Sequence, residues 1–263
     1  FRIYPGIGYR HLLVVNGGPD NLKTVPPHDI MGCPIEEHLP TGLGSQQICG
    51  IMNSAEKILL ESSINADRIR RGQLPANAIW LWGSGKALDL PSLNVKYSFC
   101  GGVISAVDLV RGIGICAGLR VVNVPGATGY LDTNYSGKAE YALQILQDEN
   151  FVYLHIEAPD EAGHNGDVYA KIKAIEDIDT YVVGSLVKGF SSLGPCRLLV
   201  TPDHPTPIKL RTHSRDPVPF LLWGQDVEPD SVNSYSEKAA LKSGRVEKHG
   251  HNLIEYLRGN ISL

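Results

Sequence analysis

The chain has 263 residues, of which 43% are hydrophobic and 20% are charged, with a formal net charge of −4. Its apolar content is sufficient for one large core or two smaller ones. The slight negative charge and the lack of a Lys- or Arg-rich block exclude a general affinity for nucleic acid, and no apolar run reaches the roughly 18 residues of a membrane span.

The cysteines are five in number and widely spaced, without a C-x-x-C pair (Cys33, Cys49, Cys100, Cys116 and Cys196). An odd, scattered set argues for reduced thiols, so we expect a cytoplasmic protein and no thiolate zinc site. The chain begins at Phe1 with a sequence typical of the middle of a domain, and we expect it to be part of a longer protein.

The first third of the chain predicts few elements and one long loop. Residues 9–15 are apolar enough for a strand, and a loop rich in Gly and Pro follows. Loops of this length inside compact domains are usually functional or disordered. Residues 45–63 carry apolar side chains at helical spacing and predict an amphipathic helix. Residues 77–85, NAIWLWGSG, predict a short strand that runs into a glycine turn.

The remainder, from about residue 93, predicts a regular alternation of helices and strands. Helices are expected at 105–117, 136–146 with Ser136 as the cap, 168–190 and 250–257, and strands at 119–124, 151–156, 197–201 and 218–224. The strands are continuous apolar runs, which is typical of a sheet covered on both faces. We therefore predict an α/β layered domain with a largely parallel sheet.

Two of these strands are followed directly by polar residues that suit metal binding: Asp160, His164, Asp203, His204 and His213. Ligands of open α/β sheets bind outside the carboxyl ends of the strands, so we expect these side chains to share one site. Carboxylates and neutral imidazoles suit Mn²⁺, Zn²⁺ and related ions, and a pair of such ions is a common device for phosphoryl transfer. Taken singly, each residue could instead cap a turn or lie on the surface.

The segment APDEAGH, followed by PDHPTP and then by RTHSRDPVPF, resembles the alkaline phosphatase superfamily. With PPHDI, IWLWGSGK and VPGATGYLDTNYSGKAE, the chain is similar more closely to the cofactor-independent phosphoglycerate mutases of the archaeal type. The resemblance implies an alkaline-phosphatase-like domain, part of a smaller α/β lid domain, and two divalent metal ions, with manganese, zinc, cobalt and magnesium all open. It implies one ion on Asp160, His164 and His213, with Asp203 and His204 belonging to the other.

The resemblance also implies an isomerase that interconverts 3-phosphoglycerate and 2-phosphoglycerate in glycolysis through a phosphoserine intermediate. Residues 1–92 would be an incomplete substrate-enclosing lid, and residues 93–263 the metal-binding catalytic domain. The family's nucleophilic serine and an aspartate of the second metal site match no position here, so the chain looks like the C-terminal two-thirds of such an enzyme. The candidates for binding phosphate or carboxylate in the lid are Arg10, His11, His28 and Lys86.

Four further residues near the predicted site have less specific expectations. Lys138 and Arg211 are additional basic candidates, but we expect each to be a solvated side chain. Glu157 and Asp167 are expected to cap turns or to orient ligands rather than to bind metal.

Two alternatives remain open at this point. The first is a metal-dependent phosphatase or phosphodiesterase of the same superfamily, and the second is a non-catalytic fragment. A nucleotide-binding module is disfavoured, because GVISAVDLVRGIG lacks the spaced glycines and the lysine of a phosphate loop. The expected partner is a small phosphoglycerate, not a nucleic acid or a membrane, and the oligomeric state is left open.

Overall fold

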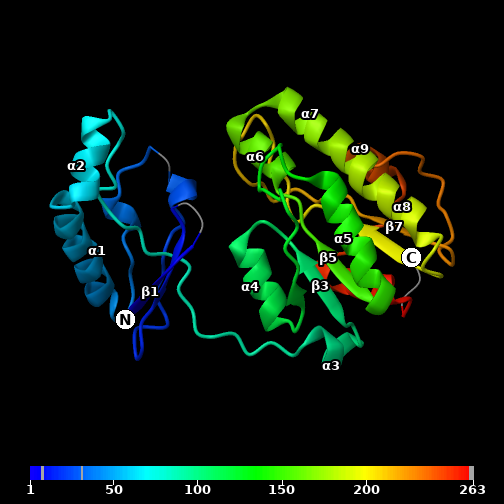
Figure 1. The fold of residues 1–263 in the computed structure, drawn as a ribbon, viewed down its shortest axis with the longest axis horizontal. Helices are drawn as coiled ribbons and strands as arrows, with labels where there is room; N and C mark the ends of the chain where they lie inside the picture. Colours follow the sequence, from blue (N-terminus) through cyan, green and yellow to red (C-terminus); the bar gives the residue numbers. More distant parts are fainter. Residues whose placement is uncertain (7–8, 31, 261–263) are drawn as a thin grey trace. The chain divides into compact units, whose positions relative to one another are not determined.

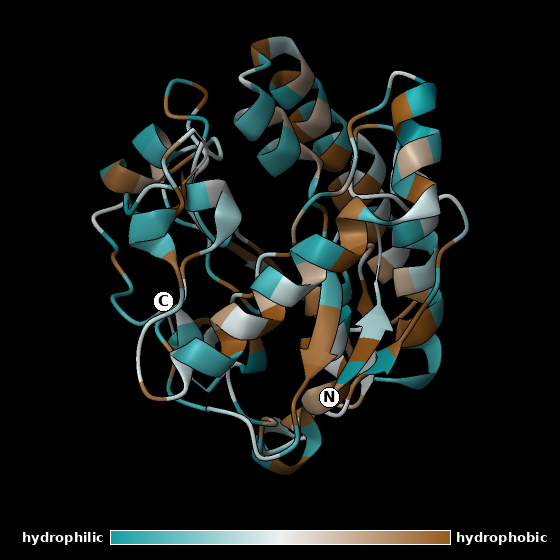
Figure 2. Cartoon of the chain, turned by 90° about the vertical axis from the view of Figure 1, so that its left-hand side faces the viewer, coloured by the Kyte–Doolittle hydropathy of each residue, from teal (hydrophilic) through white to brown (hydrophobic). Residues whose placement is uncertain are grey.

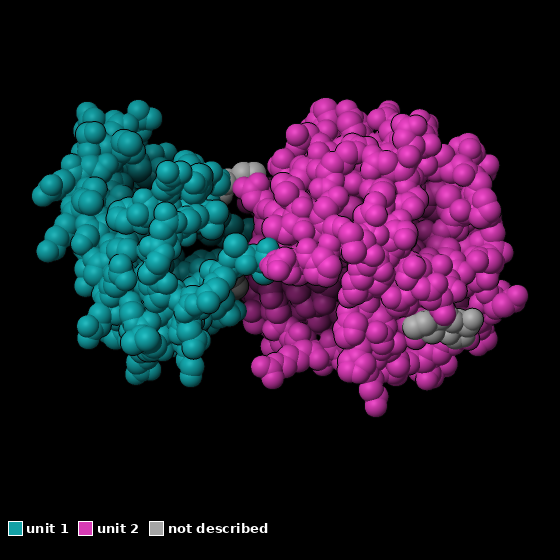
Figure 3. All heavy atoms as spheres, turned by 90° about the horizontal axis from the view of Figure 1, so that it is seen from below, with its two compact units in different colours: residues 1–88 teal, residues 89–263 magenta. Residues whose placement is uncertain are grey.

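The computed structural model describes residues 1–6, 9–30 and 32–260, with only the backbone of His28. The chain divides into two compact units, Phe1–Leu88 and Asp89–Leu263 (Figure 3). Each unit is described by itself below, and the role of the first unit as a lid stays a prediction. No helix among the described residues is long and apolar enough to cross a membrane.

The first unit combines an antiparallel hairpin with two helices (Figure 1). Its elements are β1 (Arg2–Pro5), β2 (His11–Val14), the 3-10 turns η1 (Pro27–Ile30) and η2 (Glu36–His38), α1 (Ser45–Leu60) and α2 (Ser63–Arg70). The hairpin pairs Arg2 with Val14. The predicted amphipathic helix is confirmed in α1, which buries Ile48 and Met52.

The predicted strand at residues 77–85 is wrong, because this segment forms no strand. Side chains hold it in place instead of a backbone ladder. The indole Nε1 of Trp80 donates to the carbonyl of Val25 at 2.8 Å, and the amide of Gly83 donates to Oγ1 of Thr24 at 3.1 Å. An apolar run can therefore be extended and anchored without pairing, which the periodicity of side chains does not reveal.

The second unit contains a three-stranded parallel sheet and a separate antiparallel pair (Figure 1). The parallel sheet has the order β4 (Arg120–Val121), β3 (Gly101–Ile104), β5 (Phe151–Leu154), and the antiparallel pair is β6 (Arg197–Val200) with β7 (Leu221–Gly224). The α/β class and its parallel sheet are confirmed, while the last two predicted strands pair antiparallel to each other.

Figure 2 shows hydrophilic and hydrophobic residues side by side along individual helices of the chain. In the second unit, helices precede and follow these strands along the chain. They are α3 (Leu93–Tyr97), α4 (Asp108–Cys116), α5 (Tyr135–Asp148), α6 (Ala158–Asn165), α7 (Val168–Asp177), α8 (Gly184–Phe190), α9 (Glu237–Lys242), the 3-10 turn η4 (Gly250–Asn252) and α10 (Leu253–Arg258). The predicted helix 168–190 is helical throughout, but the π-helical stretch Ile178–Val183 separates α7 from α8.

Two predicted details of this unit need correction. The strand expected at 119–124 is reduced to Arg120–Val121. The cap of α5 is Asn134, whose side chain accepts from the amide of Gly137 at 2.8 Å, and Ser136 lies inside the first turn. Asn and Ser are comparable caps, so residue type alone does not decide which of positions 134 and 136 caps the helix.

Strand β3 is the centre of the parallel sheet, and its two faces pack against different helices. A Cβ on Gly102 would lie 2.9 Å from Cδ1 of Ile145 in α5, whereas a Cβ on Gly114 of α4 would lie 2.5 Å from Cγ1 of Val103. Ile104 belongs to the hydrophobic cluster on the α5 side, and Val103 belongs to a second cluster. Neighbouring residues of a strand point to opposite faces, so the sheet is covered on both.

The close packing of α4 on β3 makes a prediction about Gly114. Gly114→Ala should destabilise the protein by about 1–3 kcal/mol, because the new methyl group overlaps Val103 in a packed core. Gly112→Ala is the matched control in the same helix, since nothing lies within 4 Å of its Cβ position. That change should be neutral or stabilising by roughly 0.5–1 kcal/mol, as alanine favours the helix. Urea unfolding of both variants measures the difference, and equal effects would contradict this packing.

Candidate metal centre

The loop after β5 turns at once into α6, which carries Asp160 and His164. Pro159 stands in the first turn, where its missing N–H is tolerated, and Gly166 ends the helix in the left-handed conformation with φ of 71°. The two side chains are four residues apart, and His164 Nε2 lies 3.2 Å from Asp160 Oδ2. The helix aims both groups at one point, because residues four apart lie on the same face.

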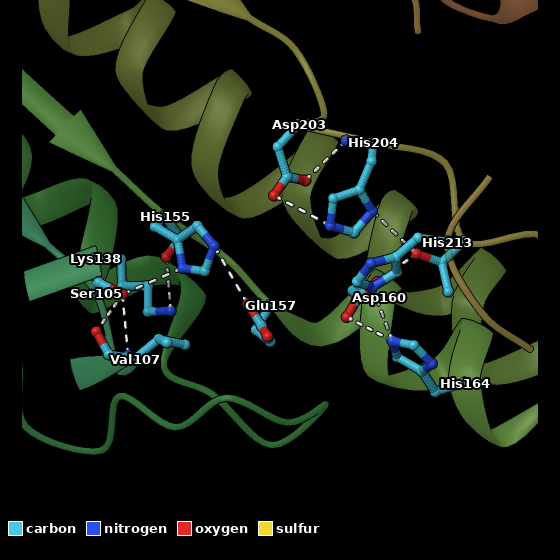
Figure 4. A network of polar contacts seen from close by, with 11 residues as sticks. Ser105, Val107, Lys138, His155, Glu157, Asp160, His164, Asp203, His204 and His213 are labelled. Carbon is cyan, nitrogen blue, oxygen red and sulfur yellow. Dashed lines mark hydrogen bonds and ion pairs between the residues drawn. The ribbon is translucent and has the colours of Figure 1, made fainter. Parts of the chain in front are cut away.

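The segment after β6 brings the other three predicted residues to the same place (Figure 4). His213 Nε2 lies 3.6 Å from Asp160 Oδ1 and 3.1 Å from His164 Nε2. The rings of His204 and His213 have centroids 3.7 Å apart, and His204 Nε2 lies 3.3 Å from Asp203 Oδ2. The five side chains therefore form one continuous polar cluster, with the side chain of Asp203 at its exposed end (75%).

Two contacts orient the ligand candidates. Thr206 is buried, and its hydroxyl donates to Oδ1 of Asp160. The Nδ1 atom of His164 lies 3.0 Å from the carbonyl oxygen of Arg211. A carbonyl oxygen can only accept, so the proton of a neutral His164 belongs on Nδ1. The lone pair of Nε2 then faces Asp160 and His213, as metal binding requires.

The spacing of the donor atoms fits a metal ion. Ligand atoms bound about 2.1 Å from one ion at tetrahedral angles lie roughly 3.4 Å apart. The Nε2 atoms of His164 and His213 lie 3.1 Å apart, and they lie 3.2 Å from Oδ2 and 3.6 Å from Oδ1 of Asp160, respectively, so each ring faces a different oxygen of the carboxylate. Asp160, His204 and His213 also offer ligand atoms that all lie within 4.8 Å of one another. Oxygen and imidazole donors of this kind suit divalent ions.

Lys138 is not the solvated side chain that the sequence suggested, since only 1% of it is exposed. Its Nζ atom donates to the carbonyl oxygen of His155 at 3.2 Å. Burial lowers the pKa of Lys138 to about 8, and the negative charge of Glu157 acts in the opposite direction. Lys138 lies on the buried face of α5 with Ala142 and Ile145, which stand four and seven residues later. This spacing is the signal in the sequence that could have indicated its burial.

Asp167 and Arg211 also had predicted roles, and the structure shows the contacts of each. Asp167 caps α7 by accepting from the amide of Ala170 at 2.9 Å, as expected. The side chain of Arg211 is exposed, while its backbone carbonyl contacts His164. Thr206 and Ser105 were missed by sequence reasoning. Thr206 lies two residues after the predicted ligand His204, where a hydroxyl residue is too common to stand out. Ser105 was predicted to begin a helix, but it follows β3, a strand that the sequence did not predict, and α4 begins only at Asp108.

The predicted substrate-binding residues lie in the first unit, and their role stays a prediction. Arg10 lies 5.4 Å from the ring centroid of Tyr9, and Nδ1 of His11 accepts from the amide of Gly6 at 3.2 Å. Lys86 is exposed and pairs with Asp20 at 2.5 Å, which raises the pKa of Lys86 and lowers that of Asp20. The side chain of His28 lies outside the described residues.

The fold and this cluster agree with the family to which the sequence belongs. The family model of the metalloenzyme superfamily matches residues 40–256, so the chain belongs to that superfamily. Membership implies dependence on a divalent metal. Residues 1–65 match the model of 2,3-bisphosphoglycerate-independent phosphoglycerate mutase. The resemblance inferred from the motifs is confirmed by both matches.

Curated relatives extend the similarity along nearly the whole chain. A Geobacter sulfurreducens protein is 50% identical over 98% of this chain and 65% of its own length. A Methanothrix thermoacetophila protein, named 2,3-bisphosphoglycerate-independent phosphoglycerate mutase, is 50% identical over 97% of this chain and 65% of its own length. The chain thus spans just under two-thirds of the length of these relatives.

Solved structures show the same fold. A protein of Pyrococcus horikoshii is 28% identical, with a TM-score of 0.69 over 82% of this chain and 57% of that one. The cofactor-independent phosphoglycerate mutase of Thermoplasma acidophilum is 25% identical, with a TM-score of 0.53 over 87% of this chain and 56% of that one. The alkaline-phosphatase-like architecture predicted from the sequence is therefore confirmed.

The buried Lys138 should give the folded protein a specific pH dependence. Its folded pKa is about 8, whereas an unfolded lysine titrates at about 10.4. Between these two pH values the unfolded chain binds more protons than the folded chain, so the free energy of unfolding of the wild type rises with pH. Below this range both states are protonated at Lys138, and the folded state bears the full cost of burying the charge.

Lys138→Met removes this titration. The stability of the variant relative to wild type should be greatest below about pH 8 and should decline toward about pH 10, by at most about 1.4 kcal/mol per pH unit. Urea unfolding across this range checks the slope, and the exposed Lys188, changed in the same way, is the control. A pH-independent difference would contradict a charged, buried Lys138.

Proposed function

We propose that this chain supplies the metal-holding part of an enzyme that interconverts 3-phosphoglycerate and 2-phosphoglycerate. The activity is proposed for a protein of the relatives' full length. The observation that carries the proposal is the convergence of Asp160, His164 and His213 from two strand ends, with donor separations of 3.1–3.6 Å. The relatives named for this reaction support the substrate class.

Asp160, His164 and His213 would hold one divalent ion, and Asp203 with His204 would contribute to a second. Such ions lower the pKa of a bound hydroxyl and offset the charge of a transferring phosphoryl group. The finer expectations, that the metal is manganese and the protein cytoplasmic, belong to the same proposal. All five cysteines are free, which supports a reducing compartment.

Other residues of the chain hold the ligand candidates in position before an ion binds. Asp160 is kept in place by the Thr206 hydroxyl, so its carboxylate does not need to reorganise when an ion arrives. His164 is held with its Nε2 lone pair toward the cluster by the Arg211 carbonyl. Pre-oriented ligands raise affinity, because less side-chain entropy is lost on binding. In the first unit, Arg10, His11, His28 and Lys86 are proposed to bind the phosphate or the carboxylate of the substrate.

The metal centre can be tested by Mn²⁺ titration calorimetry. Asp160→Asn should weaken Mn²⁺ binding, because it removes a negatively charged metal ligand. The loss should exceed the roughly 10–100-fold that is typical when a residue that only contacts a metal-binding side chain is changed. Asp167→Asn is the matched control, since the same charge is removed from a residue that caps α7 and Asn also caps helices. Equal affinities of the two variants would count against Asp160 as a ligand.

The reaction can be tested on the full-length protein loaded with Mn²⁺. We expect 2-phosphoglycerate to form from 3-phosphoglycerate without stoichiometric release of phosphate, and Asp160→Asn to abolish this conversion. Release of inorganic phosphate without 2-phosphoglycerate would identify a phosphatase of the same superfamily and refute the mutase proposal. Coupled assays for the two products distinguish these outcomes directly.

A further inference from the structure

A second chain of polar contacts begins at the carboxyl end of β3 and ends where α6 begins (Figure 4). Ser105 follows β3 and is buried, His155 follows β5, and Glu157 precedes the first residue of α6. Ser105 Oγ lies 3.1 Å from His155 Nδ1, and His155 Nε2 lies 3.2 Å from Glu157 Oε2. The proposed function assigns no role to this chain of contacts.

The backbone of His155 is fixed from both sides. Its amide donates to the carbonyl oxygen of Ile104 at 2.8 Å, which continues the ladder between β3 and β5. Its carbonyl accepts from the buried ammonium group of Lys138 at 3.2 Å. The backbone from which the imidazole extends is therefore held in place, and the two ring nitrogens contact Ser105 and Glu157 directly.

The two neighbours of the ring determine where its proton resides. A carboxylate only accepts, so the nitrogen that faces Glu157 is the one that carries hydrogen. A neutral imidazole has one such hydrogen, which leaves Nδ1 as an acceptor for the Ser105 hydroxyl. The oxygen of Ser105 accepts from the amide of Val107 at 3.0 Å. Its hydroxyl hydrogen could also be donated to the carbonyl of Val107, but that oxygen lies farther away, at 3.5 Å, than Nδ1 of His155 does, at 3.1 Å.

Burial supports the neutral form of this ring. It lowers the pKa of His155, and the nearby carboxylates of Asp203 and Asp160 act in the opposite direction. The side chains of His155 and Glu157 are only 18% and 21% exposed, so water does not readily replace their contact. The ring is thus held between a hydroxyl donor and a carboxylate acceptor.

Glu157 in turn determines how α6 starts. Its carbonyl oxygen accepts from the amides of Asp160 at 2.9 Å and Glu161 at 3.2 Å, which forms the first turn of the helix. Asp160 stands in that turn and His164 stands one turn later. A displacement of Glu157 would therefore be transmitted directly to both ligand candidates.

We propose that His155 is a positioning residue for the metal centre: locked by Ser105 as the Nε2–H tautomer, it holds Glu157 and thereby the first turn of α6, so that Asp160 and His164 are presented to the ion. This inference rests on the proposed metal centre. His155 is not among the ligand candidates, and it acts through Glu157.

Two substitutions of His155 separate its two contacts. In His155→Gln the amide nitrogen can occupy the place of Nε2 and face Glu157, while in His155→Asn the shorter amide reaches Ser105 but not Glu157. Mn²⁺ affinity, measured by calorimetry on the chain, should fall about tenfold in His155→Asn, as for other residues that orient ligands. It should stay within about threefold of wild type in His155→Gln. Thermal unfolding of both variants shows whether each is folded.

A purely structural role predicts a different result, in which affinity and melting temperature fall together in both variants. That result, or equal affinities in both, would overturn the proposal. Wild-type protein that binds no Mn²⁺ would instead refute the metal centre itself, which keeps the two failures apart.

A spectroscopic measurement on the metal-free protein tests whether His155 is held in one tautomer. Selective ¹⁵N labelling of histidine and long-range ¹H–¹⁵N correlation spectra distinguish protonated from unprotonated ring nitrogens, and His155→Gln identifies the signals of His155. We expect a single tautomer with the proton on Nε2, and Ser105→Ala should convert it into a mixture. A wild-type ring protonated on Nδ1, or exchanging between tautomers, would contradict the proposal even if the metal data agreed.

Discussion

The carboxylate of Asp160 is the group on which the rest of the site depends. It lies partly buried between α6 and the segment after β6, where an ionised group without partners would be costly. The structure surrounds it with the hydroxyl of Thr206 and with the rings of His164 and His213. These partners converge from positions up to 53 residues away from Asp160 along the chain, so the site exists only when both strand-end segments are folded.

The parallel sheet brings a second pair of distant residues together, Ser105 and His155. The parallel strands β3 and β5 end at the same edge, and the residues that follow them, Ser105 and His155, are therefore neighbours although 50 positions separate them. The glycines at Gly102 and Gly114 let helices approach both faces of β3 closely. The covered sheet is rigid because it is packed on both sides, and rigid supports suit sites that must hold ligands in a defined arrangement.

Lys138 shows that the interior of this unit carries charge as well as apolar side chains. Its ammonium group is buried against the carbonyl of His155, and Glu157 is close enough to favour its charged form. Such a group costs stability compared with an apolar residue of similar volume, but it fixes a backbone position that an apolar residue could not hold. Lys138 thus supports the backbone of His155, whose ring contacts Ser105 and Glu157.

The sequence by itself determined the α/β class, the amphipathic helix α1 and the identity of the metal-ligand candidates, because these follow from local periodicity and from residue types placed after apolar runs. It did not determine that residues 77–85 lack a strand partner, that Asn134 rather than Ser136 caps α5, or that Lys138 is buried. The Asn134 cap is a local contact with Gly137, but the other two features depend on partners distant in the chain, Trp80 on Val25 and Lys138 on His155. The position of Asp160 depends in the same way on Thr206. Only the tertiary structure brings such partners together, since pairing and burial are decided by which surfaces meet and not by the local pattern that precedes folding.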